Sequence, residues 1–76
     1  PEGPRRRTWQ LPDGLGTEVT AINFGARPVD EVVRLEGVAP GLLQEVLAGE
    51  MMGAFDASGE LRIELRPRQG KAYLIQ

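Results

Sequence analysis

The residues of this 76-residue chain that could do chemistry are its carboxylates, because the sequence contains no Cys and no His. Their absence excludes disulfides, thiolate nucleophiles, imidazole catalysis and nearly every transition-metal site. Asp30 and Glu31 are adjacent, so on a strand they would point to opposite faces. Glu60 and Glu64 share a face, but each lies beside an arginine, which favours the ionised carboxylate, whereas a general acid must stay protonated. We therefore predict no catalytic residue, no cofactor and no metal site in this chain.

Trp9 is the residue that the sequence singles out for contact with a ligand or another domain. An exposed Trp can stack on a sugar ring, as in carbohydrate-binding modules. Such modules usually present several aromatic residues on one face, whereas this chain has one Trp, one Tyr and two Phe in all. Burial of Trp9 against the domain itself or against a neighbouring domain is therefore the favoured interpretation, and sugar contact is the alternative.

Other large apolar side chains are assigned to the core. Tyr73 alternates with Ile75, and Phe24 alternates with Ile22, as expected of residues that share one face of a strand. The pair 51–52 consists of two methionines, which could form an adaptable contact surface, but filling gaps in the core is the favoured interpretation.

The first seven residues, with two prolines, one glycine and three consecutive arginines, are predicted to form a flexible linker or tail. A nucleic-acid site needs many phosphate contacts, and residues 8–76 carry ten acidic and six basic residues, so we expect no nucleic-acid partner. No apolar run approaches the roughly 20 residues of a membrane helix, so no membrane partner is expected either. Residues 8–76 are predicted to be a single domain, of a size that profits from a neighbouring surface. The lack of Cys fits either the cytoplasm or export, so localisation stays unknown.

The pattern of apolar residues predicts an all-β fold. Residues 60–66 alternate strictly between apolar and charged types, which is typical of a strand with one dry and one wet face. Residues 42–47 fit helical spacing as well, but the short stretch between Gly41 and Gly49 favours a strand, a turn and a second strand. A bulge is expected near Asp30–Glu31. About six to seven short strands separated by Gly/Pro turns indicate a small antiparallel β-sandwich with Greek-key-like connections, or a small barrel. The expected strands cover residues 8–11, 18–24, 29–35, 42–47, 51–55, 60–66 and 71–76.

Three segments carry a resemblance to a known class of domain. Residues 19–29 (VTAINFGARPV) contain a hydrophobic strand followed by Asn-Phe, a small turn and Pro-Val, and residues 45–50 (EVLAGE) resemble an acidic-Leu-Leu-Thr-Gly-Glu element with Ala48 in place of Thr. Residues 59–67 and 70–75 resemble a closing pair of strands in which Leu-x-Pro ends the first. Together the segments resemble the C-terminal β-sandwich domains of glycoside hydrolases of the α-amylase superfamily, with β-galactosidase C-terminal domains similar.

The resemblance implies a non-catalytic accessory domain. In such enzymes the catalytic carboxylates lie in a separate barrel domain, so no catalytic residue carries over to this chain. The implied partner is that catalytic barrel of the same polypeptide, which the sandwich would pack on and stabilise, with oligomerisation through the parent enzyme or polysaccharide contact as further roles. Two alternatives stay open: an independent carbohydrate-binding module using Trp9, and a stand-alone interaction or dimerisation domain that pairs through a strand edge.

Overall fold

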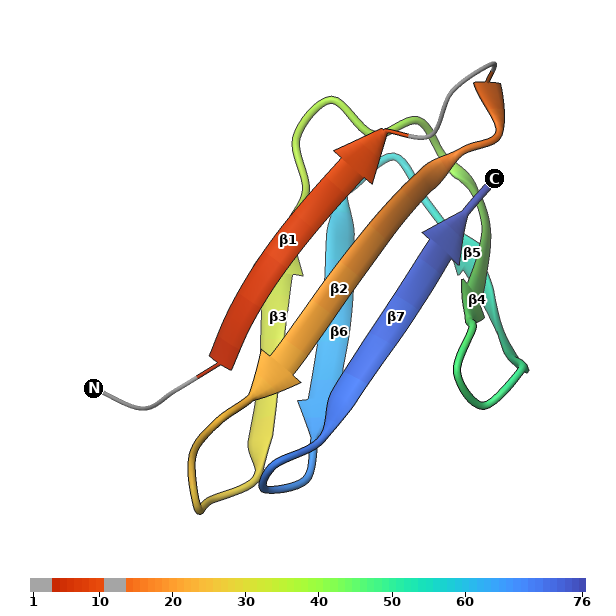
Figure 1. Cartoon of the computed structure of the whole chain (residues 1–76). Helices are drawn as coiled ribbons and strands as arrows, with labels where there is room; N and C mark the ends of the chain where they lie inside the picture. The colour runs from red at the N-terminus through yellow and green to blue at the C-terminus, as the bar shows by residue number, and fades with distance from the viewer. Residues whose placement is uncertain (1–3, 11–13) are drawn as a thin grey trace.

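The computed structural model describes residues 4–10 and 14–76, with only the backbone at positions 4, 9 and 10. The described residues form seven strands and no α-helix (Figure 1). Residues 42–47, which fit both helix and strand, form the end of one strand and the start of a turn, as predicted. The strands are β1 (Pro4–Gln10), β2 (Thr17–Asn23), β3 (Val29–Arg34), β4 (Gly41–Glu45), β5 (Glu50–Phe55), β6 (Glu60–Leu65) and β7 (Gly70–Ile75).

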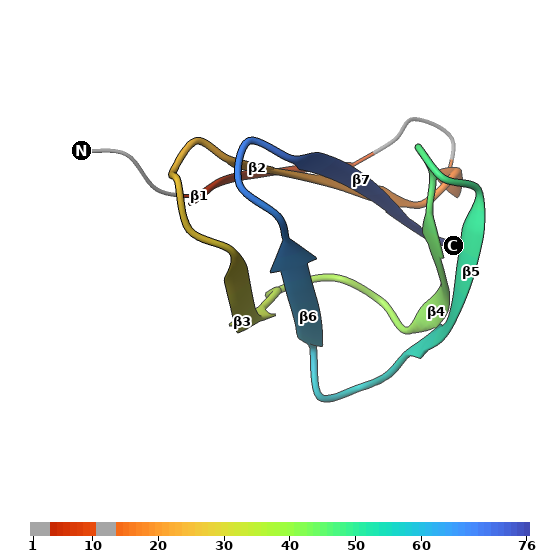
Figure 2. The same ribbon diagram turned by 90° about the horizontal axis from the view of Figure 1, so that it is seen from below.

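The strands form two antiparallel sheets that face each other. The larger sheet has the order β1-β2-β7-β4-β5, and the smaller one pairs β3 with β6. Viewed along the layers, β3 and β6 lie opposite β1, β2 and β7, while β4 and β5 turn down along one side (Figure 2). The prediction of an all-β antiparallel sandwich is confirmed.

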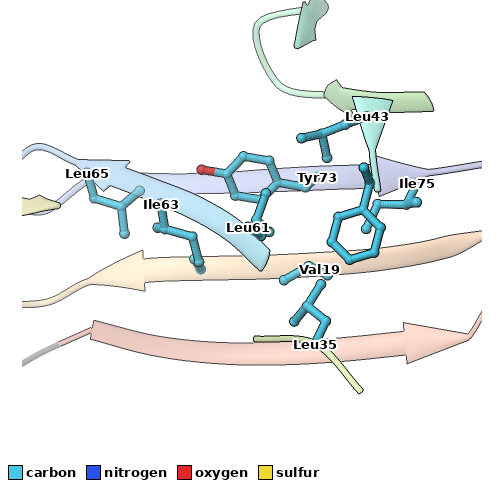
Figure 3. Packing of buried hydrophobic residues seen from close by; sticks show 10 residues of the cluster. Val19, Leu35, Leu43, Leu61, Ile63, Leu65, Tyr73 and Ile75 are labelled. Atoms are coloured by element: carbon cyan, nitrogen blue, oxygen red, sulfur yellow. The ribbon is translucent and has the colours of Figure 1, made fainter. Parts of the chain in front are cut away.

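The core lies between the two layers and is made by alternate residues of the strands (Figure 3). In β6 the burial alternates without a break, so that the charged residues of the predicted wet face are exposed. Tyr73 is fully buried, as predicted, and Ile75 is buried beside it. The buried hydrophobic residues are Val19, Ala21, Leu35, Leu43, Phe55, Leu61, Ile63, Leu65, Tyr73 and Ile75.

Two core assignments made from the sequence are wrong. Ile22 and Phe24 are exposed, because β2 turns Val19, Ala21 and Asn23 inward and the intervening residues outward. Met51 and Met52 are also exposed, Met51 at 59% of its surface, in the edge strand β5, whose alternation between the two faces is broken at Met52.

The predicted bulge at Asp30–Glu31 is also wrong, since β3 and β6 pair without interruption from Val29 to Arg34. The bulge lies instead between β4 and β5, where Leu43 pairs with Gly53 and Gln44 pairs with Met51, so that Met52 is the extra residue. Gly53 has a φ of 97°, which glycine adopts without strain and other residues rarely do.

The predicted flexible tail of residues 1–7 is corrected in part, because β1 begins at Pro4. Arg5, Arg6 and Arg7 pair with residues 22, 21 and 20 of β2. Composition suggested a tail because the segment has no apolar anchor, but backbone hydrogen bonding to β2 needs none. Residues 1–3 lie outside the described part of the chain.

Asn23 joins the two connections that cross between the sheets at one end of the sandwich. These connections link β2 to β3 and β6 to β7. The buried Asn23 side chain donates to the carbonyl oxygens of Arg27, at 2.7 Å, and Arg66, at 3.1 Å, while its own oxygen accepts from the Gly25 N–H at 2.9 Å. Its backbone N–H donates to the Gln69 carbonyl at 2.9 Å. Asn23 therefore holds both crossovers together.

We predict that Asn23→Ala lowers the free energy of unfolding by about 3 kcal/mol, because it leaves two carbonyls and one N–H of the crossovers without their partner. Urea denaturation followed by circular dichroism measures the loss. Asn23→Asp is the informative comparison, because it keeps the acceptor for Gly25 but cannot donate to Arg27 or Arg66. A loss below about 0.5 kcal/mol for both variants would contradict the assigned role.

Candidate interaction face

The outer face of the five-stranded sheet is a candidate interaction surface, because several apolar residues are exposed on it. Register places Thr20 of β2 opposite Ala72 of β7, and Leu74 opposite Gln44 of β4, all with side chains directed away from the core. We define the outer face by residues Glu18, Thr20, Ile22, Leu42, Gln44, Met51, Ala54, Ala72 and Leu74, with Arg5 and Arg7 at its β1 margin.

Most of the outer face is apolar. Leu42 exposes 60% of its surface and Met51 59%, and Ile22 is also exposed. Leu42 and Ala54 also line a shallow depression that reaches Phe55 and Gln76. Leu42, Met51 and Ala54 are neighbours on β4 and β5, whereas Ile22 lies at the other end of the sheet beside Gly70. Exposed apolar side chains that gather in one patch, as the first three do, mark an interaction surface in soluble proteins.

The opposite side of the molecule is polar. On the outer surface of the β3–β6 sheet, Arg62 holds Asp30 with two hydrogen bonds, of 3.0 Å from Nε and 2.7 Å from Nη2. This contact keeps the pKa of Asp30 below its ordinary value. Glu64 lies 3.7 Å from the same guanidinium. Asp30, Arg62 and Glu64 are therefore paired within the molecule, while Val32 of the same face is exposed.

The free edges of the larger sheet are poor sites for strand pairing. At one edge, β1 begins with a proline, which has no N–H to donate, and continues with three arginines. At the other edge, the bulge at Met52 and the left-handed Gly53 distort β5. Charges, prolines and bulges are the features by which natural sheets block edge-to-edge association. The face of this sheet is therefore the better candidate for a partner.

Glu45 shapes the hairpin at the border of the outer face. This buried carboxylate accepts hydrogen bonds from the N–H groups of Leu47 at 3.1 Å and Ala48 at 2.7 Å in the β4–β5 turn, and from Ala72 of β7 at 3.0 Å. Burial raises the pKa of Glu45, but these three N–H groups, together with the nearby Lys71, outweigh it, so the pKa lies below its ordinary value. The turn is consequently held in one conformation with Leu47 in solvent.

Tyr73 is a second buried group whose pKa is shifted. Burial, with Glu45 and Glu64 nearby, raises the pKa of Tyr73 to about 12. Its hydroxyl has no hydrogen-bond partner among the described residues. The side chain is fully enclosed by the core, so a substrate cannot reach it, and we assign it no chemical role.

The carboxylates considered from the sequence do not come together as a catalytic pair. Asp30 is held by Arg62 on the polar face, whereas Glu31 lines a groove between β1 and β3 together with Arg6 and Ala21. Within residues 4–10 and 14–76, no three acidic residues lie close enough to hold a metal ion. The same residues form no helix that is long and apolar enough to cross a membrane.

Trp9 cannot be placed as a contact residue. Its backbone pairs with Glu18 of β2, but its side chain lies outside the described part of the molecule. The prediction of a ligand or domain contact through Trp9 therefore stays a prediction.

Sequence reasoning missed the structural roles of Asn23 and Glu45 and the outer face itself. Asn23 and Glu45 lie in segments that resemble accessory β-sandwich domains, and the sequence pattern alone does not indicate their hydrogen bonds. The signal for the face was a mixed one, since Leu42, Met51 and Leu74 are apolar residues in strands whose other faces are apolar too. Comparison of the chain with models of protein families, with curated proteins and with solved structures finds no match.

The lowered pKa of Glu45 predicts a pH-dependent stability. The folded-state pKa is depressed, so this contribution is present above the unfolded-state pKa and is lost as the pH falls through the folded-state value. We expect Glu45→Gln to cost about 2 kcal/mol at pH 7, because the amide cannot replace the charge-assisted acceptor. The loss should shrink as the pH approaches 3.

Urea denaturation of both proteins between pH 7 and pH 3 measures this convergence. Glu31→Gln is the control, because Glu31 is exposed and accepts no hydrogen bond among the described residues. Parallel stability curves for the original protein and Glu45→Gln across this range would contradict the role of the ionised carboxylate.

Proposed function

We propose that this chain is a non-catalytic accessory β-sandwich domain of a carbohydrate-active enzyme. Its role is to pack, through the outer face of the five-stranded sheet, on the catalytic barrel of the same polypeptide and to stabilise it. The observation that carries the proposal is the asymmetry of the sandwich. On the outer surface of the β3–β6 sheet Arg62 pairs with Asp30, whereas the five-stranded sheet presents Leu42, Met51 and Ile22 to solvent.

The chemistry of the chain supports a structural role. Two of its carboxylates are held within the molecule, Asp30 by Arg62 and Glu45 by backbone N–H groups. The described residues offer no pair of carboxylates in a cleft for hydrolysis of a glycosidic bond, which needs two such groups flanking the substrate. A domain that does not carry the reaction acts through its surface.

The segments that resemble accessory β-sandwich domains also contain two side chains that fix the connections between strands. The Asn-Phe motif contains Asn23, which ties the two crossovers, and the acidic residue of the hairpin motif is Glu45, which holds the β4–β5 turn. Both positions need a particular side chain in this architecture. The resemblance therefore falls on residues with a structural reason to be shared by domains of one fold.

The first test is the coding sequence upstream of Pro1. The proposal expects a barrel-sized domain there, with the acidic residues of a glycoside hydrolase. An open reading frame with no such domain would overturn the proposal.

The second test asks whether the outer face is covered in the full-length polypeptide. Leu42→Cys and Val32→Cys are a matched pair, because these residues expose 60% and 59% of their surface on opposite faces of the sandwich, and the chain has no Cys of its own. We expect a thiol reagent to label V32C quickly and L42C slowly in the native full-length polypeptide, and both quickly after denaturation. Peptide mapping by mass spectrometry identifies the labelled position. Equal labelling of both in the native state would contradict docking through this face.

A further inference from the structure

The smaller sheet has a free edge at β3. This strand pairs with β6 on one side and with no described strand on the other. Figure 2 shows β3 at the side of its layer, whereas β6 lies between β3 and the β4–β5 hairpin. β3 contains no proline and no glycine, and it pairs with β6 without a bulge. It therefore lacks the proline and the bulge that hinder pairing at the two edges of the larger sheet.

Three residues of β3 direct their backbone groups to this edge. The N–H of Leu35 donates to the carbonyl of Gly59 at 2.7 Å, in the same register as the β3–β6 pairs. Hydrogen-bonded and non-bonded pairs alternate in an antiparallel ladder, so every second residue counted from Leu35 bonds to β6. The others, Asp30, Val32 and Arg34, point their N–H and C=O groups away from β6, and none of these groups bonds to a described turn or loop.

The order of these three residues is self-complementary. Their side chains are exposed on the outer surface of the sheet, with Val32 midway between the acidic Asp30 and the basic Arg34. When two copies of β3 lie antiparallel about a two-fold axis at Val32, Val32 meets Val32 and Asp30 of each copy meets Arg34 of the other. All three residues are then in hydrogen-bonded pairs, so the free N–H and C=O groups of both strands find partners.

The same pattern specifies one register. The smallest shift that keeps the hydrogen bonding moves one strand by two residues. Such a shift sets Val32 opposite Asp30 or Arg34 and leaves these charges without an opposite charge across the junction. Opposite charges that face each other across two strands are favourable, so the register centred on Val32 is preferred.

We infer that β3 pairs with β3 of a second copy of this chain, which joins the two smaller sheets into one continuous four-stranded sheet. Both signs of charge are also present on the inner side of the junction, where Arg6 and Glu31 line the groove between β1 and β3. A symmetric contact of one surface with itself is the commonest arrangement in homodimers. The inference goes beyond the proposed function, because β3 belongs to the layer opposite the outer face and both surfaces can be occupied at once.

The first test is disulfide formation by Val32→Cys in the full-length polypeptide. In the inferred dimer the two Cα atoms at position 32 lie about 5.5 Å apart, which a disulfide can span. Glu60→Cys is the control, because Glu60 is exposed on the same face but lies on β6, one strand further from the axis. We expect mild oxidation to convert V32C into a covalent dimer on a non-reducing gel and to leave E60C monomeric. Peptide mapping by mass spectrometry verifies the bond between the two positions 32.

The second test reverses a charge at the junction. Arg34→Asp places a carboxylate opposite Asp30 at two places in the dimer, so we expect it to slow covalent dimer formation by V32C about tenfold. Arg68→Asp makes the same change of charge in the exposed β6–β7 turn and should leave the rate unchanged. Hydrogen exchange of the polypeptide without cysteine substitutions, followed by mass spectrometry, measures the protection of β3.

Three results would overturn the inference: no covalent dimer of V32C, equal rates for V32C and E60C, or equal effects of R34D and R68D. Slow hydrogen exchange in β3 without a covalent dimer of V32C would instead assign the edge to a strand from elsewhere in the polypeptide. Strand pairing leaves the outer side of β3 in solvent, so V32C kept reduced still labels quickly with a thiol reagent. Protection of L42C therefore tests the proposed function independently of this dimer.

Discussion

The fold depends on one buried amide. Asn23 sits where the chain twice passes from one sheet to the other, and its side chain bonds to both passages at once. Backbone groups at such crossings have left one ladder without joining another, and burying them unpaired is costly. By meeting this need, Asn23 sets the relative position of β2, β3, β6 and β7, and therefore which residues face the core.

The same constraint accounts for the exposure of Ile22. Asn23 points inward, so Val19 and Ala21 do too, and Ile22 is left outside. Val19 is seen among the core residues in Figure 3. On the opposite sheet the outward positions of β3 and β6 are charged apart from Val32, and Arg62 pairs with Asp30. The outer surface of the β3–β6 sheet shows what a solvent-facing sheet looks like in this chain. The outer surface of the five-stranded sheet differs from it by its exposed apolar residues, and this contrast underlies the proposed docking.

Most of the strands could be predicted from the sequence, because residues 60–66 alternate cleanly and Gly/Pro turns separate the elements. The burial of the residues in β2 and β5 could not. Both faces of β2 carry apolar residues, so the sequence does not show whether Ile22 or Ala21 faces the core. The long-range hydrogen bond from Asn23 to Arg66 decides it, because it turns Asn23 and Ala21 inward. The exposure of Met51 depends on the position of β5 at the edge of the sheet, and strand order cannot be read from the local sequence. The candidate face was hidden for the same reason, since it is a property of strand order in the sheet.

The way Glu45 holds the β4–β5 turn has a consequence for how this surface can change over time. The conformation of the tip is imposed by a side chain in the strand below it, and Val46, Leu47 and Ala48 contribute backbone hydrogen-bonding groups. The exposed side chains of Leu47 and Ala48 can therefore be replaced while the loop keeps its shape. Because Glu45 holds the backbone of this loop, the side chains at its tip can change during evolution and form new contacts without altering the shape of the hairpin. For the same reason, the tip is a suitable place for protein engineers to graft recognition sequences.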